Sequence, residues 1–103
     1  MVEVHDNPTE HRFEILDEGK LAGFARYVRR PGRLILVHTE IDPAFEGRGL
    51  GSQLAAAALD AARASGERVV PLCPFIRSFV ERHADYTDLV DHRLVAHLDQ
   101  GAD

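Results

Sequence analysis

The sequence predicts a single α/β (α+β) domain in which an antiparallel β-meander leads into a β-α-β unit. Three observations support this fold class. Apolar and polar residues alternate early in the chain, as they do in half-buried strands. A run of four apolar residues, 34–37, is then followed by a glycine-rich loop and an alanine-rich helical pattern. A further short apolar segment follows the predicted helix and completes the β-α-β unit.

Length and composition are those of one globular domain. The 103 residues are 45% hydrophobic, which is enough to bury a core without crosslinks. We therefore expect one domain over 1–103, with a core at about 10–92 and polar termini. The lone cysteine, Cys73, excludes an internal disulfide and is typical of a reducing compartment. No segment resembles a signal peptide or a membrane span, so we expect a cytoplasmic protein without a membrane partner.

The charge balance argues against a nucleic-acid partner. The formal net charge is −5, whereas a duplex-binding protein needs a basic face. The local exception is the stretch 29–33 (RRPGR), which we interpret as a solvated hairpin turn because Pro-Gly favours turns. The histidines show no metal-ligand spacing with Cys73, so we expect no metal.

The first half of the chain predicts three antiparallel strands joined by tight turns. Residues 17–20 (DEGK) and the Pro-Gly pair at 31–32 supply the turn chemistry. The apolar run in the third strand is typical of a central strand buried on both faces. The strands are expected at about 11–17, 20–29 and 33–42.

The glycine loop is followed by a helix and a short parallel strand. Apolar residues at helical spacing predict a helix over 52–64, and Gly66 is placed to end it in a left-handed cap. Residues 68–72 then predict a strand parallel to the one that ends near Asp42. The inner face of the helix is expected to consist of Leu54, Ala55, Ala58, Leu59 and Ala62.

The last third of the chain predicts one more helix and a shorter element. Pro74 suits the first turn of a helix. Residues 89–90 and 94–95 predict a final short strand or helix against the sheet. The inner face of the helix that begins at Pro74 is expected to consist of Phe75, Ile76, Phe79, Val80 and His83.

The loop 46–51 (EGRGLG) predicts an anion site. Glycines at alternate positions free the backbone to bend, and the following helix adds unpaired N–H groups and the positive end of its dipole. This combination suits phosphate or pyrophosphate. Ligands of open sheets bind beyond the carboxyl ends of strands, and here that edge comprises residues 38–41 and 72–74.

Three segments in this order resemble the GNAT superfamily of N-acetyltransferases, specifically its minimal YidJ-like branch. They are 38–41 (HTEI), 45–51 (FEGRGLG) and 71–75 (PLCPF), the last followed by Arg82, His83 and Tyr86. With the element order, the resemblance covers about residues 10–92. It implies a GNAT-like domain with splayed parallel strands, and the acetyl-CoA-dependent transfer of an acetyl group to an amine.

The resemblance also implies how coenzyme A is held. The loop amides would bind the pyrophosphate, and strand 38–41 would pair with the pantetheine arm. Glu46 departs from the Gln or Arg that is usual there, so we expect its carboxylate to point outward. The implied cofactor-binding residues are His38, Thr39, Glu40, Ile41, Gly47, Arg48, Gly49, Leu50, Gly51, Ser52 and Cys73.

Four residues are candidates for catalysis. His38 and Glu40 share one face of their strand, and His38 has the better ordinary pKa for a base near neutrality. Cys73 is a candidate to accept the acetyl group transiently or to protonate the coenzyme A thiolate, and the alternative is a buried small apolar residue. Tyr86 is the residue type that larger family members use to protonate that thiolate, and its alternative is a packing role.

Two rival functions stay open. The first is a non-catalytic acyl-CoA-binding or sensing module, which would bind acetyl-CoA without turnover. The second is a Rossmann-type nucleotide-binding fold, disfavoured because the glycine loop follows three strands instead of opening the chain. The amine acceptor, a small molecule or a protein lysine or N-terminus, is not encoded in any motif, and we expect a monomer or weak homodimer.

Overall fold

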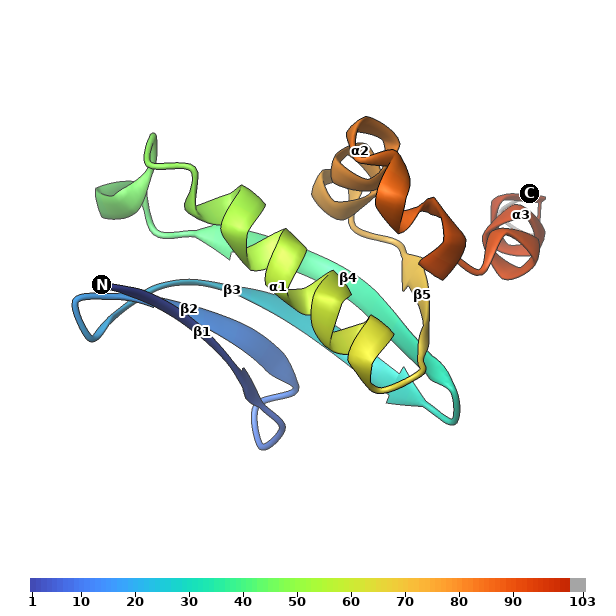
Figure 1. Ribbon diagram of the computed structural model, residues 1–103, viewed down its shortest axis with the longest axis horizontal. Coiled ribbons are helices and arrows are strands. Elements are labelled where there is room, and N and C mark those ends of the chain that lie inside the picture. The colour runs from blue at the N-terminus through green and yellow to red at the C-terminus, as the bar shows by residue number, and fades with distance from the viewer. Residues whose placement is uncertain (101–103) are drawn as a thin grey trace.

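The computed structural model describes residues 1–100, which form one five-stranded sheet with helices packed against it (Figure 1). The strands lie in the order β1-β2-β3-β4-β5; neighbours are antiparallel except β4 and β5, which are parallel. The predicted fold class is confirmed; residues 101–103 of the expected domain lie outside the described residues. The strands are β1 (Val2–Asn7), β2 (Arg12–Asp17), β3 (Lys20–Arg30), β4 (Arg33–Ile41) and β5 (Arg68–Pro71).

Both predicted hairpin turns are present. Glu18 and Gly19 join β2 to β3 with positive φ angles of 51° and 77°, and Gly32 joins β3 to β4 at a φ of 74°. The expectation that β4 is buried on both faces is wrong. Leu34 and Leu36 are buried beneath α1 (Leu50–Ala64), but Val37 is 39% exposed. The face of the sheet that is turned away from α1 is called the outer face below.

Strand β1 is an addition to the predicted element order. It pairs with the whole of β2, from Val2 opposite Asp17 to Asn7 opposite Arg12. Four of its six side chains are exposed, and only Val2 and Val4 alternate with polar residues, which is too short a pattern to identify a strand.

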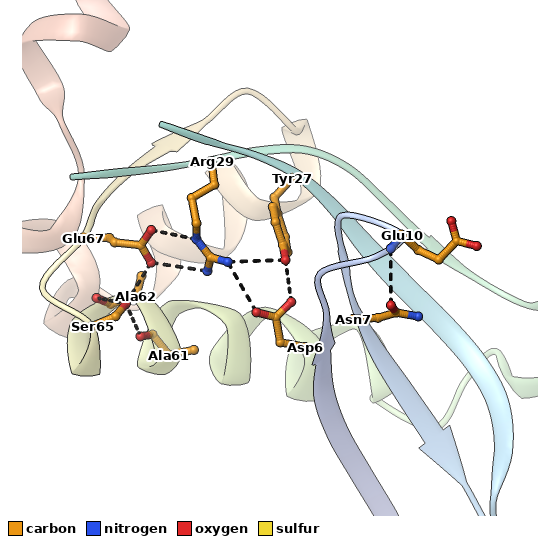
Figure 2. A network of polar contacts seen from close by, with 9 residues as sticks. All are labelled: Asp6, Asn7, Glu10, Tyr27, Arg29, Ala61, Ala62, Ser65 and Glu67. Atoms are coloured by element: carbon orange, nitrogen blue, oxygen red, sulfur yellow. Dashed lines mark hydrogen bonds and ion pairs between the residues drawn. The ribbon is translucent and has the colours of Figure 1, made fainter. Parts of the chain in front are cut away.

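A partly exposed polar network joins β1 to the rest of the domain (Figure 2). The Tyr27 hydroxyl donates to Asp6 of β1 at 2.5 Å, and Arg29 reaches Asp6 at 3.4 Å and Glu67 at 2.8 Å. Burial, followed by the bond to Asp6, raises the pKa of Tyr27 to about 12. Arg29 therefore links β1 to the turn between α1 and β5. The sequence had placed Arg29 only in a solvated hairpin turn at 29–33.

Helix α1 packs across β2 to β5 (Figure 1). It begins at Leu50, two residues before the predicted start, and buries the expected apolar face. It ends in the predicted left-handed cap at Gly66, where φ is 71°. The amides of Gly66 and Glu67 donate to the carbonyls of Arg63 and Ala62, which is the Schellman arrangement.

The chain after β5 forms α2 (Pro74–Arg82), the 3₁₀ helix η2 (Ala84–Leu89) and α3 (His92–Gln100). Ile76, Phe79 and Val80 are buried as expected, but the prediction is wrong for two residues. Phe75 is 38% exposed, and the exposed His83 stacks on Phe79 at the end of the helix, with 4.0 Å between ring centroids. Among the described residues, no helix is both long and apolar enough to cross a membrane.

Candidate active site

The parallel strands β4 and β5 separate halfway along β4. Their pairing runs from Arg33 opposite Arg68 to Leu36 opposite Pro71. The amides of Leu72 and Cys73 both donate to the Leu36 carbonyl, and this contact closes the paired region. In the described chain, β4 then continues to Ile41 without a strand partner on the β5 side. The predicted splay is therefore present, and it leaves backbone donors and acceptors of β4 available at this edge.

A bulge at Val37 decides where the next side chains of β4 point. Arg26 of β3 lies opposite His38, whereas its neighbour Tyr27 lies opposite Leu36, so Val37 is the extra residue. After the bulge, His38 and Glu40 lie on the outer face and Thr39 lies on the α1 side.

Cys73 lies at the start of α2, facing Thr39. Its side chain is buried, with 3% of the residue exposed, and its thiol donates to the Thr39 hydroxyl at 3.4 Å. Cys73 is also the N-cap of α2, with Pro74 as the first helical residue. The predicted sheet edge is thus assembled, but Cys73 and His38 reach it from opposite faces of β4.

His38 and Glu40 line a groove of about 700 Å³ at the end of β4. His38 Nε2 lies 3.9 Å from Glu40 Oε1, and the His38 and Phe24 rings lie 6.2 Å apart. Both polar side chains are more than half exposed, so protons can exchange with solvent there.

The groove also includes residues outside the predicted site, among them Gly23 and Phe24 of β3. A Cβ on Gly23 would lie 2.5 Å from the Glu40 carbonyl oxygen, so only glycine lets β3 approach β4 there. A glycine inside a predicted strand was the signal for this close approach. Phe24 carried no signal beyond strand alternation, because its place beside His38 depends on strand register.

The glycine loop forms the entry to α1. Gly47 and Gly49 have φ angles of 81° and 72°, a region that favours glycine, and Gly49 is the N-cap. No side chain caps this helix end, so its first amides are available to an anion. A Cβ on Gly51 would lie 2.9 Å from Phe75 Cζ, so Gly51 also lets α1 and α2 approach one another.

The two charged residues of the loop behave differently. Arg48 Nη1 lies 3.1 Å from Asp17 Oδ2, and the Arg48 guanidinium lies over the Phe45 ring, so this side chain is directed toward the β2 end of the sheet. Glu46 is exposed, and it borders both the β4 groove and the hollow around the glycine loop.

Tyr86 is held away from this edge. Its hydroxyl donates to Asp60 of α1 at 2.8 Å, and its ring lies 5.9 Å from that of Phe79. Asp60 is roughly 15 Å along the helix from Leu50. Burial, followed by the bond to Asp60, raises the pKa of Tyr86 to about 12. The structure brings His38, Glu40, Thr39 and Cys73 together and leaves Tyr86 in a packing contact.

Within residues 1–100, no group of three or more histidine, cysteine or carboxylate side chains is arranged to hold a metal.

Solved structures share this architecture. A GCN5-like candidate N-acetyltransferase from Staphylococcus aureus matches with a TM-score of 0.66 at 23% identity, covering 85% of this chain and 86% of its own. The ribosomal-protein-alanine N-acetyltransferase of Brucella melitensis biovar Abortus 2308 matches at 0.55 and 19%, covering 70% and 59%. Ard1 from Thermoplasma volcanium matches at 0.53 and 22%, covering 61% and 44%. At these identities the likeness establishes the fold.

The sequence comparisons give the family. No relative is found among curated proteins. The family model described as GCN5-related N-acetyl-transferase matches residues 12–89, which include the glycine loop, the splayed strands and Cys73. The chain therefore belongs to the GCN5-related N-acetyltransferases.

Proposed function

We propose that this protein transfers the acetyl group of acetyl-CoA to an amine at the splayed edge of β4 and β5. One observation carries the proposal: the free edge of β4, the uncapped start of α1 and the Cys73–Thr39 pair meet at the same end of the sheet. Members of the family use acetyl-CoA as acyl donor, so the reaction class follows from membership. The acceptor and the residue roles are our proposals.

The donor is proposed to bind through backbone groups. The amides from Gly47 to Ser52 would hold the pyrophosphate, because the start of α1 offers N–H groups without a side-chain cap. The unpaired edge of β4 from His38 to Ile41 would pair with the amides of pantetheine, as an added strand does. Because backbone amides hold the phosphates in this arrangement, the Glu46 carboxylate need not contact them.

The proposed reaction has two proton transfers, and the residues that carry them out lie on opposite sides of β4. The amine nitrogen attacks the thioester carbonyl, and His38 takes the amine proton while Glu40 orients the imidazole. A β4 amide near His38 would donate to the carbonyl oxygen as it gains charge, a contribution typically worth about 3–4 kcal/mol. When the carbon–sulfur bond breaks, Cys73 gives its thiol proton to the departing sulfur. Cys73 and His38 then exchange the proton through solvent, and both return to their starting states.

The first test is thermal unfolding with acetyl-CoA, coenzyme A, NAD and ATP in parallel. Selective stabilisation by the two coenzyme A species is expected, about 2.7 kcal/mol at a hundredfold excess over the dissociation constant. Stabilisation by NAD or ATP alone would overturn the proposal in favour of a nucleotide-binding function.

The second test is thiol release from acetyl-CoA with a panel of small amines and free-N-terminal peptides. Turnover that is lost in His38→Ala is the expected result. Binding of acetyl-CoA without thiol release from any acceptor would replace the enzyme with the rival function, an acyl-CoA-binding or sensing module.

A further inference from the structure

The outer face of β3 carries a row of side chains that the proposed reaction does not use. Tyr27 and Arg29 point to the α1 side, where they join the network with Asp6. Alternation along β3 therefore directs the even-numbered residues from 24 to 30 to the outer face. We call this row, comprising Phe24, Arg26, Val28 and Arg30, the arginine stripe.

The two arginines of the stripe are unpaired with carboxylates. Arg26 lies over the Phe24 ring at 5.7 Å, and Arg30 donates to the neighbouring Arg29 carbonyl at 3.1 Å. Neither has a salt bridge within the described part of the chain, whereas Arg12 beside them is paired with Glu14 at 2.7 Å. In a protein of net charge −5, two free guanidinium groups in one row form a local positive surface.

The stripe begins at the active-site groove and leads away from it. Phe24 lies opposite Glu40 in the sheet, and Arg26 lies opposite His38. Phe24 lines the groove together with three carboxylates, those of Glu40, Asp42 and Glu46. A second hollow, of about 550 Å³, borders the far end of the stripe at Arg26, Val28 and Arg30, where the arginines outnumber the one carboxylate of the lining, Glu10. The surface thus changes from acidic at the reaction centre to basic along β3.

From this charge pattern we infer that the acceptor is an extended peptide whose N-terminal amine enters the groove and whose acidic residues bind the arginine stripe. The inference rests on the proposed function, because it names the acceptor class of that same site. The groove carboxylates attract the ammonium form, which loses one proton to solvent before the neutral amine attacks and gives its next proton to His38. Arg26 and Arg30 bind carboxylates farther along the same peptide, and Val28 supplies an apolar contact between them.

Strand geometry fixes which peptide positions are read. Arg26 and Arg30 lie two and six residues beyond Phe24, and an extended peptide advances by the same rise, about 3.3 Å per residue. With the first residue at the level of Phe24, the third and seventh residues face the two arginines. Two exposed ion pairs of ordinary strength together raise the affinity, or kcat/KM, by about tenfold.

The experiment compares two fluorescent peptides of about seven residues that differ only at their third and seventh positions, which are Glu in one and Lys in the other. Binding is measured by fluorescence anisotropy with coenzyme A present, and kcat/KM by thiol release. The Glu peptide is expected to be preferred by about tenfold. The double variant Arg26→Glu/Arg30→Glu is expected to reverse the preference. The matched control Arg82→Glu/Arg93→Glu makes the same change in net charge on α2 and α3 and is expected to keep the original preference.

Equal binding of the two peptides, or the same preference in the stripe variant and the control, would overturn the inference. If the protein is not an acetyltransferase, no thiol is released even with small amines. Fluorescence anisotropy would still measure the binding of the two peptides to the arginine stripe in that case. If the charge-reversed variant does not fold, Arg26→Gln/Arg30→Gln serves instead and must abolish the preference.

Discussion

The thiol of Cys73 and the hydroxyl of Thr39 lie 3.4 Å apart across the point where β4 and β5 separate. Cys73 is buried, and its thiol forms its hydrogen bond with the Thr39 hydroxyl. By rotating, this hydroxyl can accept a hydrogen bond from the thiol or donate one to the thiolate. This contact connects the start of α2 to the strand that carries His38 and Glu40. Under the proposed function, this contact would orient the thiol for proton transfer, a role that a small apolar residue could not fill.

Replacing Cys73 with Ala is expected to lower kcat by about 10²- to 10⁴-fold, the usual range for loss of a positioned proton donor. Stabilisation by acetyl-CoA should be unchanged, because the proposed binding groups are backbone amides. Unchanged turnover in this variant would exclude both catalytic roles of the thiol. Mass spectrometry of the wild-type protein after acetyl-CoA alone separates those roles, since an acid leaves the protein mass unchanged and a nucleophile adds one acetyl group.

Thr39→Val keeps the shape of the side chain and removes its hydrogen bond to Cys73. We expect kcat to fall by about tenfold, the value of one ordinary hydrogen bond, with Thr39→Ser retaining most of the activity. Full activity in the Val variant together with a loss in the Ser variant would show that the methyl group, and not the hydroxyl, matters.

Tyr86→Phe is expected to leave kcat within about threefold of wild type, because the Tyr86 hydroxyl bonds to Asp60 away from the splayed edge. The free energy of unfolding should fall by about 1 kcal/mol for the lost hydrogen bond. Urea unfolding and thiol release measure the two quantities. A large loss of kcat in a stably folded variant would restore Tyr86 as a catalytic residue.

Gly51 and Phe75 are expected to be energetically coupled. Gly51→Ala gains up to about 1 kcal/mol of helix propensity, but its methyl group meets the Phe75 ring at 2.9 Å. The substitution should therefore stabilise the Phe75→Ala background more than it stabilises the wild-type protein. Urea unfolding of the four proteins gives this coupling, and additive effects would contradict the contact.

Stability is expected to fall as the pH rises from about 10 to about 12. The folded pKa of Tyr27 is about 12, above its ordinary value of about 10, so the fold favours the protonated hydroxyl. This contribution is complete below pH 10 and is lost at up to about 1.4 kcal/mol per pH unit above it. Tyr27→Phe should show a smaller loss across this range in urea unfolding. An identical pH dependence in the variant would contradict burial of the Tyr27 hydroxyl against Asp6.

The sequence by itself determined the order and type of most elements, because their signals are local. Residues that tolerate positive φ predicted the hairpin turns, one apolar face predicted α1, and Gly66 predicted the end of that helix. The glycine loop at the start of α1 was equally readable, since alternate glycines before a helix have few other uses. Strand β1 gave a weaker signal, because most of its side chains are exposed and its bond to Tyr27 joins residues that are distant in the sequence.

Only the tertiary structure decided which side chains meet. The bulge at Val37 sends His38 and Glu40 to one face and Thr39 to the other, and a one-residue shift of this kind cannot be read from alternation alone. The place of Tyr86 depends on where η2 packs against α1, and the row formed by Phe24, Arg26, Val28 and Arg30 on the outer face depends on the register of β3. Local propensity sets the elements, whereas contacts between residues distant in sequence follow from packing, register and the burial of one shared core.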